Sequence, residues 1–218
     1  MELKFTSRTY KLTGLTPLLG TQAASRSIRT EYIASKAPTD ALREEEEANP
    51  FDLDAKGLTV FMRDGREQLC LLDYQIKGFF KESIQALRPQ LNIAAAKGKV
   101  DTLIFVEPRY IPLKRDGQPF LEEDEQLERS LRTDGPMGPR TCLQASEMIN
   151  DPWEIEIEIS LFGSNGSGKS SPLTWEAVEL ALDYGAFHGL GQWRNAGYGR
   201  FTWARTDDGE GEEAQGDA

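Results

Sequence analysis

One segment of the chain has the residue types and spacing to bind a nucleotide, GSNGSGKS at residues 163–170. It fits the phosphate-loop pattern G-x-x-x-x-G-K-[ST], in which Lys169 would contact the β- and γ-phosphates. The preceding WEIEIEISLF alternates strictly between Ile and Glu, which indicates an antiparallel strand with one solvent-exposed face. A phosphate-loop strand is instead buried on both faces and reads as a continuous apolar run. The sequence therefore favours a Gly/Ser connection between a strand and a helix over an ATPase.

A second segment, GLGQWRNAGYGRFTW at residues 189–203, combines glycines, arginines and aromatic residues. Residues without Cβ let backbone amides approach phosphate oxygens, and arginine guanidinium groups bind phosphate strongly. Aromatic side chains stack on unpaired bases. The residues of this segment that we assign to a candidate nucleic-acid site are Gly191, Trp193, Arg194, Asn195, Gly197, Tyr198, Gly199 and Arg200. In the competing interpretation, the glycines only allow a tight crossing from helix to strand, with Trp193 and Phe201 in the core.

Four further cations are candidates for the same site. Lys77 and Lys81 are one helical turn apart, and Arg132 and Arg140 fall in a Pro- and Gly-containing stretch that could reach over a bound strand. The alternative is that all four are solvated surface residues. The single histidine, His188, is expected to cap the end of a helix rather than to act as a base.

Composition limits the class of protein. A chain of 218 residues with 39% hydrophobic content is long enough to form a packed core. No window holds eighteen apolar residues and the start lacks the apolar segment of a signal peptide, so we expect a cytoplasmic protein. Two cysteines, Cys70 and Cys142, and one histidine cannot form the usual metal-ligand clusters, so we expect no metal and no cofactor.

The net charge of −11 is concentrated in two acidic runs. One is Glu44–Glu47, and the other is the stretch DDGEGEEAQGDA at the end of the printed sequence, for which we predict a disordered acidic tail over 206–218. The rest of the chain is close to neutral, which leaves room for a local basic surface. We predict one domain over 1–205 with insertions at about 21–57 and 109–151.

The order of the expected elements defines the fold class. The patterns predict a strand at the start, a hairpin turning at Asp64-Gly65, a helix over 74–88, a strand over 100–108, the Ile/Glu strand, a helix from Trp175 and a final strand. This order is that of an α+β, ferredoxin-like or RNA-recognition-motif-like β-α-β-β-α-β domain, an antiparallel sheet backed by two helices with large inserted loops.

Three segments in this order resemble the repeat-associated mysterious protein superfamily of CRISPR effector backbone subunits and guide-processing ribonucleases. They are LTPLLG at 15–20, IKGFFK at 76–81 and the glycine-rich stretch at 189–201. The chain is also similar to small phage and prophage proteins. The resemblance implies a ferredoxin-like fold and binding of single-stranded nucleic acid, with RNA favoured over DNA, in a repeating CRISPR-like assembly.

Three functions follow from these observations. The first is non-enzymatic binding of single-stranded nucleic acid through the glycine-rich loop, with self-association or CRISPR-like subunits as partners and no membrane. The second is a phage-encoded interaction or anti-defence protein whose acidic surface engages a host protein. The third is a ribonuclease of the same superfamily, although the processing nucleases often carry their histidine in a region other than that of His188.

The phosphate-loop match can be tested directly. Lys169→Ala should melt at the same temperature as the parent protein, and ATP should not raise the melting temperature of either one. The reason is that the strand before the motif has the pattern of an antiparallel sheet. Thermal melts of both proteins with and without ATP check this. Micromolar ATP binding that disappears in the variant would restore the nucleotide-binding interpretation.

Overall fold

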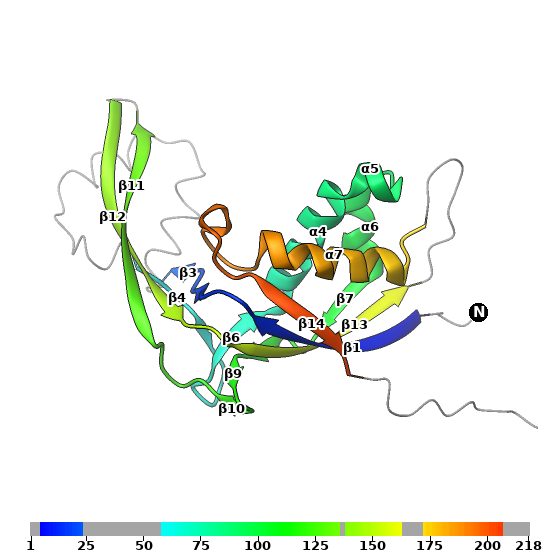
Figure 1. Ribbon diagram of the computed structural model, residues 1–218, viewed down its shortest axis with the longest axis horizontal. Coiled ribbons are helices and arrows are strands. Elements are labelled where there is room, and N and C mark those ends of the chain that lie inside the picture. The colour runs from blue at the N-terminus through cyan, green and yellow to red at the C-terminus, as the bar shows by residue number, and fades with distance from the viewer. Residues whose placement is uncertain (1–4, 24–57, 136–137, 163–171, 207–218) are drawn as a thin grey trace, which may run out of the picture.

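The computed structural model describes residues 5–23, 58–135, 138–162 and 172–206 (Figure 1). It confirms a mixed α+β chain built largely from antiparallel sheets. The phosphate-loop match, Glu44–Glu47 and the acidic tail from residue 207 lie outside the described residues, as does nearly all of the predicted insertion at 21–57.

The central sheet contains four main strands in the order β7-β13-β1-β14, and each adjacent pair is antiparallel. These strands are β1 (Phe5–Gly14), β7 (Ile104–Glu107), β13 (Glu154–Phe162) and β14 (Phe201–Arg205), and the short β9 (Lys114–Arg115) and β10 (Gln118–Pro119) extend the sheet beside β13. Figure 1 shows the helices gathered on one face of this sheet. They are α4 (Asp73–Ala86), α5 (Arg88–Leu91), α6 (Ala96–Leu103) and α7 (Trp175–His188).

The alternation in β13 decides which face of the sheet is buried. Ile155, Ile157 and Ile159 are at most 1% exposed and pack under the helices, whereas Glu156 and Glu158 lie on the open face. The predicted solvent-exposed face of this strand is therefore confirmed. The predicted helix start at Trp175 is confirmed, and Thr174 caps it, because its Oγ1 accepts a hydrogen bond from the amide of Ala177 at 3.4 Å.

Two boundaries predicted from sequence are wrong. Pro89 does not end the helical region but lies in the first turn of α5, where its missing N–H is not needed. The segment from Val100 to Leu103 belongs to α6 rather than to the following strand, because Val100 packs into the core from a helix.

A second sheet stands beside the first and consists mainly of a long hairpin (Figure 1). Its strands are β11 (Glu125–Gly135), β12 (Gly138–Ile149), β4 (Leu58–Val60), β3 (Gln22–Ala23) and β2 (Leu18–Leu19). A three-stranded sheet of β5 (Met62–Arg63), β6 (Leu69–Leu72) and β8 (Tyr110–Pro112) contains the expected turn at Asp64-Gly65. The stretch 109–151, predicted as an inserted loop with a hairpin, is thus mostly strand.

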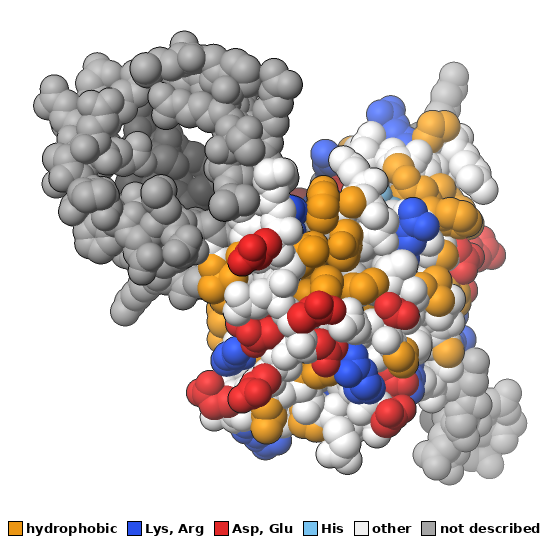
Figure 2. Space-filling view, turned by 60° about the vertical axis from the view of Figure 1, so that its left-hand side comes forward, with side chains coloured by type: hydrophobic (Ala, Val, Ile, Leu, Met, Phe, Trp, Pro, Cys, Tyr) orange, Lys and Arg blue, Asp and Glu red, His pale blue; other side chains and the backbone are white. Residues whose placement is uncertain are grey.

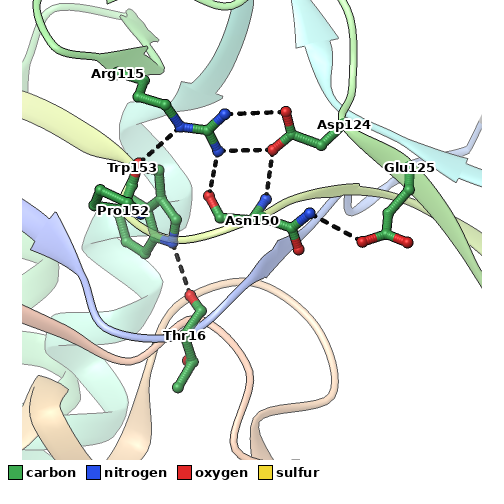
Figure 3. Close-up of polar contacts among 7 residues, drawn as sticks. All are labelled: Thr16, Arg115, Asp124, Glu125, Asn150, Pro152 and Trp153. Atoms are coloured by element: carbon green, nitrogen blue, oxygen red, sulfur yellow. Dashed lines mark hydrogen bonds and ion pairs between the residues drawn. The ribbon is translucent and has the colours of Figure 1, made fainter.

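A fully buried tryptophan supports the segment after β1. Trp153 is 0% exposed, and its Nε1 donates to the carbonyl oxygen of Thr16 at 2.9 Å (Figure 3). Gly14 lies so close that a Cβ there would be 2.2 Å from Trp153 Nε1. The amide of Gly14 also donates to the Trp153 carbonyl at 2.7 Å. The indole therefore fixes the path of residues 14–16.

The polar side chains drawn in Figure 3 stabilise the turn at residues 150–152, directly before Trp153. Arg115 makes two hydrogen bonds to Asp124, at 2.7 and 3.1 Å, and its Nη2 donates to the carbonyl of Asn150 at 2.7 Å. The Asp124 carboxylate also accepts from the amide of Asn150 at 2.7 Å. The hydrogen bonds from Arg115 hold the pKa of Asp124 below its ordinary value, so the carboxylate stays charged and paired.

The same substitution at two glycines tests this packing. Gly14→Ala should lower the free energy of unfolding by about 1–3 kcal/mol, because the added methyl group overlaps the indole. Gly78→Ala, in α4 with open space around its Cα, should raise it by about 0.5–1 kcal/mol through helix propensity. Urea denaturation measures both. Equal changes in the two variants would contradict the packing described for Gly14.

Candidate functional site

The glycine-rich loop, residues 189–200, connects α7 to β14 and contains the short 3₁₀ helix η1 (Arg194–Ala196). Its base is closed by the amide of Leu190, which donates to the carbonyl of Gly199 at 2.8 Å. The amide of Gly199 in turn donates to the carbonyl of Pro17 at 2.8 Å. The loop therefore packs with its base against the segment that follows β1.

Glycines at the base of the loop are required by close backbone approach. A Cβ on Gly199 would lie 2.0 Å from the Leu190 carbonyl oxygen, and one on Gly189 would lie 2.4 Å from that of Tyr198. The amides of Gly189, Gly197 and Gly199 all donate to carbonyl groups of the chain itself. These three amides are already satisfied, so they do not form the phosphate cradle that glycines suggest from sequence.

Thr16 contacts both the glycine-rich loop and the buried indole of Trp153. Its hydroxyl donates to the carbonyl of Gly197 at 2.8 Å and accepts from the amide of Arg200 at 2.9 Å. The amide of Leu15 donates to the carbonyl of Arg200 at 2.7 Å. Because Trp153 also binds Thr16, this residue connects the buried indole to the end of the loop that leads into β14.

The outer part of the loop carries a stacked aromatic pair. The rings of Trp193 and Tyr198 are 5.3 Å apart between centroids and tilted by 11°. Trp193 is 39% exposed and has a left-handed φ of 53°, whereas Phe201 is fully buried. The competing interpretation therefore holds for Phe201 but is wrong for Trp193, which lies at the surface.

The two arginines of the loop differ in what they contact. The Nη1 atom of Arg194 pairs with the Glu82 carboxylate on α4 and lies 3.0 Å from His188 Nε2. Arg194 thus anchors the loop to the helices instead of extending into solvent. Arg200 is exposed, forms no ion pair with any described residue, and places its guanidinium beside Gly197. Asn195 is also exposed.

His188 takes part in this anchor rather than only capping its helix. Its Nε2 lies 3.1 Å from the Glu82 carboxylate, and its ring stacks on Tyr184 at 5.3 Å. Burial works against the charge of Glu82, but the hydrogen bonds from Arg194 and His188 outweigh it and hold the pKa of Glu82 below its ordinary value.

A cation that we did not predict also contacts the loop. Arg129 of β11 places its guanidinium carbon 4.9 Å from the centre of the Trp193 ring, and its Nη2 donates to Gln192 Oε1 at 2.9 Å. The side chain is only 9% exposed, and burial lowers the pKa of Arg129. The sequence contained one indication of this buried position. Residues 127, 129 and 131 share one face of a strand, and Arg129 is flanked there by Leu127 and Leu131.

The remaining predicted cations do not join the loop. Lys81 pairs with Asp101 at 2.5 Å, and Lys77 donates to the carbonyl of Asp101 at 2.8 Å, so both face α6. Arg132 and Arg140 lie on adjacent rungs of the β11–β12 ladder, farther along the hairpin than Arg129. Their side chains are outside what the structure describes.

The open face of the central sheet is acidic. Glu107 and Glu158 are directly paired across β7 and β13, and Glu154 and Glu156 lie on the same face. Lys11 forms an ion pair with Glu154 at 2.8 Å, and Lys114 lies opposite Glu154 in the β9–β13 ladder. A face of this charge repels phosphate groups, so the sheet surface is a poor candidate for nucleic acid. Figure 2 shows another side of the molecule, where acidic side chains dominate below a band of hydrophobic ones.

Among the described residues, no three His, Cys, Asp or Glu side chains are grouped as metal ligands would be. None of their helices is long and apolar enough to cross a membrane.

Comparison with known proteins gives one structural neighbour of interest. No family model matches the sequence, and no curated protein matches it. The fold is similar to that of a chain in a cryo-EM structure of the Type III-B Cmr-beta bound to cognate target RNA, with a TM-score of 0.47 and 10% sequence identity. The similarity covers 92% of this chain and 59% of that chain, so this chain matches less than two thirds of its neighbour.

The anchor at Glu82 gives a pH-dependent prediction. Because the pKa of Glu82 is lowered on folding, its contribution to stability is present above the unfolded value, near 4.5, and is lost as the pH falls through the folded pKa. Glu82→Gln should therefore melt below the parent protein at neutral pH, and the difference should vanish in acid. Glu156→Gln removes the same charge from the sheet face and serves as the control. A Glu82→Gln deficit that does not change with pH would exclude the charged anchor.

Proposed function

We propose that the chain binds single-stranded nucleic acid through the exposed part of the glycine-rich loop, without catalysing a reaction. The observation that carries this proposal is the stacked pair of Trp193 and Tyr198, in which the indole is 39% exposed and the half-buried Tyr198 ring lies against it. A partly exposed aromatic pair provides a platform on which unpaired bases stack, whatever their sequence. Arg200 lies in the same loop and is available for a phosphate group.

The arrangement of strands supports a ferredoxin-like domain of the repeat-associated mysterious protein superfamily. The order β7-β13-β1-β14, with α4 and α7 on one face, is the order expected for a split β-α-β-β-α-β domain. The three segments of resemblance take corresponding places: LTPLLG follows β1, IKGFFK lies in α4, and the glycine-rich stretch follows α7. This membership favours RNA as the strand and a repeating, CRISPR-like assembly as the context.

The acidic sheet face favours a second candidate function, an interaction protein that engages a basic partner. Four glutamates, Glu107, Glu154, Glu156 and Glu158, share this face with two lysines, Lys11, which is already paired with Glu154, and Lys114, which lies opposite Glu154 in the β9–β13 ladder. A protein with this function would bind a basic protein and no oligonucleotide. An oligonucleotide titration at low salt therefore separates the two candidates.

Two substitutions in the loop should weaken binding in different ways. Arg200→Ala should lower the salt slope of binding by about one unit, because one phosphate contact and its counterion are lost. Trp193→Ala should cost about 1–3 kcal/mol of binding free energy with the slope nearly unchanged. Fluorescence anisotropy of a labelled single strand across salt concentrations measures both effects.

Matched variants away from the loop serve as controls. Tyr110→Ala removes an aromatic ring that is 46% exposed on β8, and Arg66→Ala removes an exposed arginine from the turn between β5 and β6. Both should bind as the parent does. If the loop variants fold normally and also bind as the parent does, the loop is not the binding site and the interaction protein becomes the better candidate.

A further inference from the structure

The contact between the β11–β12 hairpin and the glycine-rich loop contains a buried cation. Arg129 is 9% exposed, and its guanidinium lies over the indole of Trp193. Only Nη2 has a hydrogen-bond partner, the side-chain oxygen of Gln192 at 2.9 Å. The arginine is thus held in place by an aromatic face and one neutral amide.

The Nε and Nη1 donors of this guanidinium have no acceptor in the part of the chain that the structure describes. Both nitrogen atoms are buried. No acidic side chain in these parts of the chain forms an ion pair with Arg129 either, although the other buried or half-buried arginines here, such as Arg115 and Arg63, each contact a carboxylate. Buried charges without a partner are costly, and buried side-chain donors are almost always satisfied in native proteins. Among the described residues, Arg129 therefore has no anionic acceptor.

We propose that Arg129 is an oxyanion site and that its occupant is a phosphate group of the bound strand. This inference rests on the proposed function and adds the residue that contacts the phosphate. Phosphate oxygens are strong acceptors for a guanidinium, and the site carries a positive charge that nothing described neutralises. Arg194, the loop arginine that seemed suited to this role from sequence, is already paired with Glu82.

The position of Trp193 connects the phosphate site to the aromatic platform. One face of the indole lies toward Arg129 and the ring also stacks on Tyr198. A base on the platform and its phosphate on Arg129 are neighbouring parts of one nucleotide. Because Nε and Nη1 are covered in the free chain, binding requires the exposed indole to shift, and the environment of Trp193 must change when the anion binds.

Inorganic pyrophosphate and a single-stranded RNA oligonucleotide are suitable probes for the full chain. Arg129→Met removes the charge at similar volume, and Arg66→Met is the matched change at an exposed arginine. Pyrophosphate should raise the melting temperature of the parent and of Arg66→Met but not that of Arg129→Met. In buffer without multivalent anions, Arg129→Met should melt at or above the parent temperature, because an unpaired buried charge has been removed. Its affinity for the oligonucleotide should fall at least tenfold.

The outcomes separate this inference from the proposed function. If the parent responds to pyrophosphate through Arg129 but binds no oligonucleotide, the anion site stands and the proposed function fails. If Arg129→Met binds the oligonucleotide as well as the parent does, the inference fails and the proposed function stands. A lower melting temperature of Arg129→Met with an unchanged pyrophosphate response would also overturn it, since it indicates a structural partner within the chain.

A second variant keeps the test decisive if the methionine variant does not fold. Arg129→Lys retains the charge but has no donor at the Nε position and fewer donors overall. It should fold and show a pyrophosphate response several-fold weaker than that of the parent. An undiminished response would exclude the guanidinium as the anion contact.

Discussion

The buried indole of Trp153 is the interaction on which the candidate site depends. It packs against Gly14, where no side chain fits, and its N–H donates to the carbonyl of Thr16. Thr16 then binds both Gly197 and Arg200 through its hydroxyl. The exposed end of the loop is therefore fixed through a short series of contacts that begins in the core. The hydrogen bonds of Arg115 to the corner before β13 hold the tryptophan in turn.

The charges of the molecule are divided between its surfaces. Glutamates cover the open face of the central sheet, whereas the cations near the glycine-rich loop lie at its contacts with α4 and with β11. Of these cations, Arg194 is engaged by Glu82, whereas Lys77 and Lys81, which do not join the loop, contact Asp101 of α6. Arg129 and Arg200 remain without a carboxylate partner among the described residues. A net negative charge is thus compatible with a small local site for an anion, since interactions over more than a Debye length are screened.

Prediction from sequence succeeded where a local pattern has one structural solution. The strict Ile and Glu alternation required a strand with one buried face, and β13 is that strand. Thr174 before an apolar helical pattern gave the start of α7. Prediction failed where two local solutions were equally acceptable. Proline ends some helices and begins others, and the segment Val100–Ile104, apolar at 100, 103 and 104, suits either a strand or the last turn of a helix.

For the candidate site, the sequence by itself determined the composition of the loop: its glycines, its aromatic pair and its arginines. Only the tertiary structure decided what each of them contacts. The partners of Arg194, Trp193 and Thr16 come from α4, β11 and the residue before β13, which lie tens of residues away along the chain. A pattern of spacing reports contacts within one helix or strand, but whether a cation is paired depends on which elements pack against it. That is why the sequence indicated Arg194 as a phosphate contact and why only the folded chain showed that Arg129 has no carboxylate partner in the described ranges.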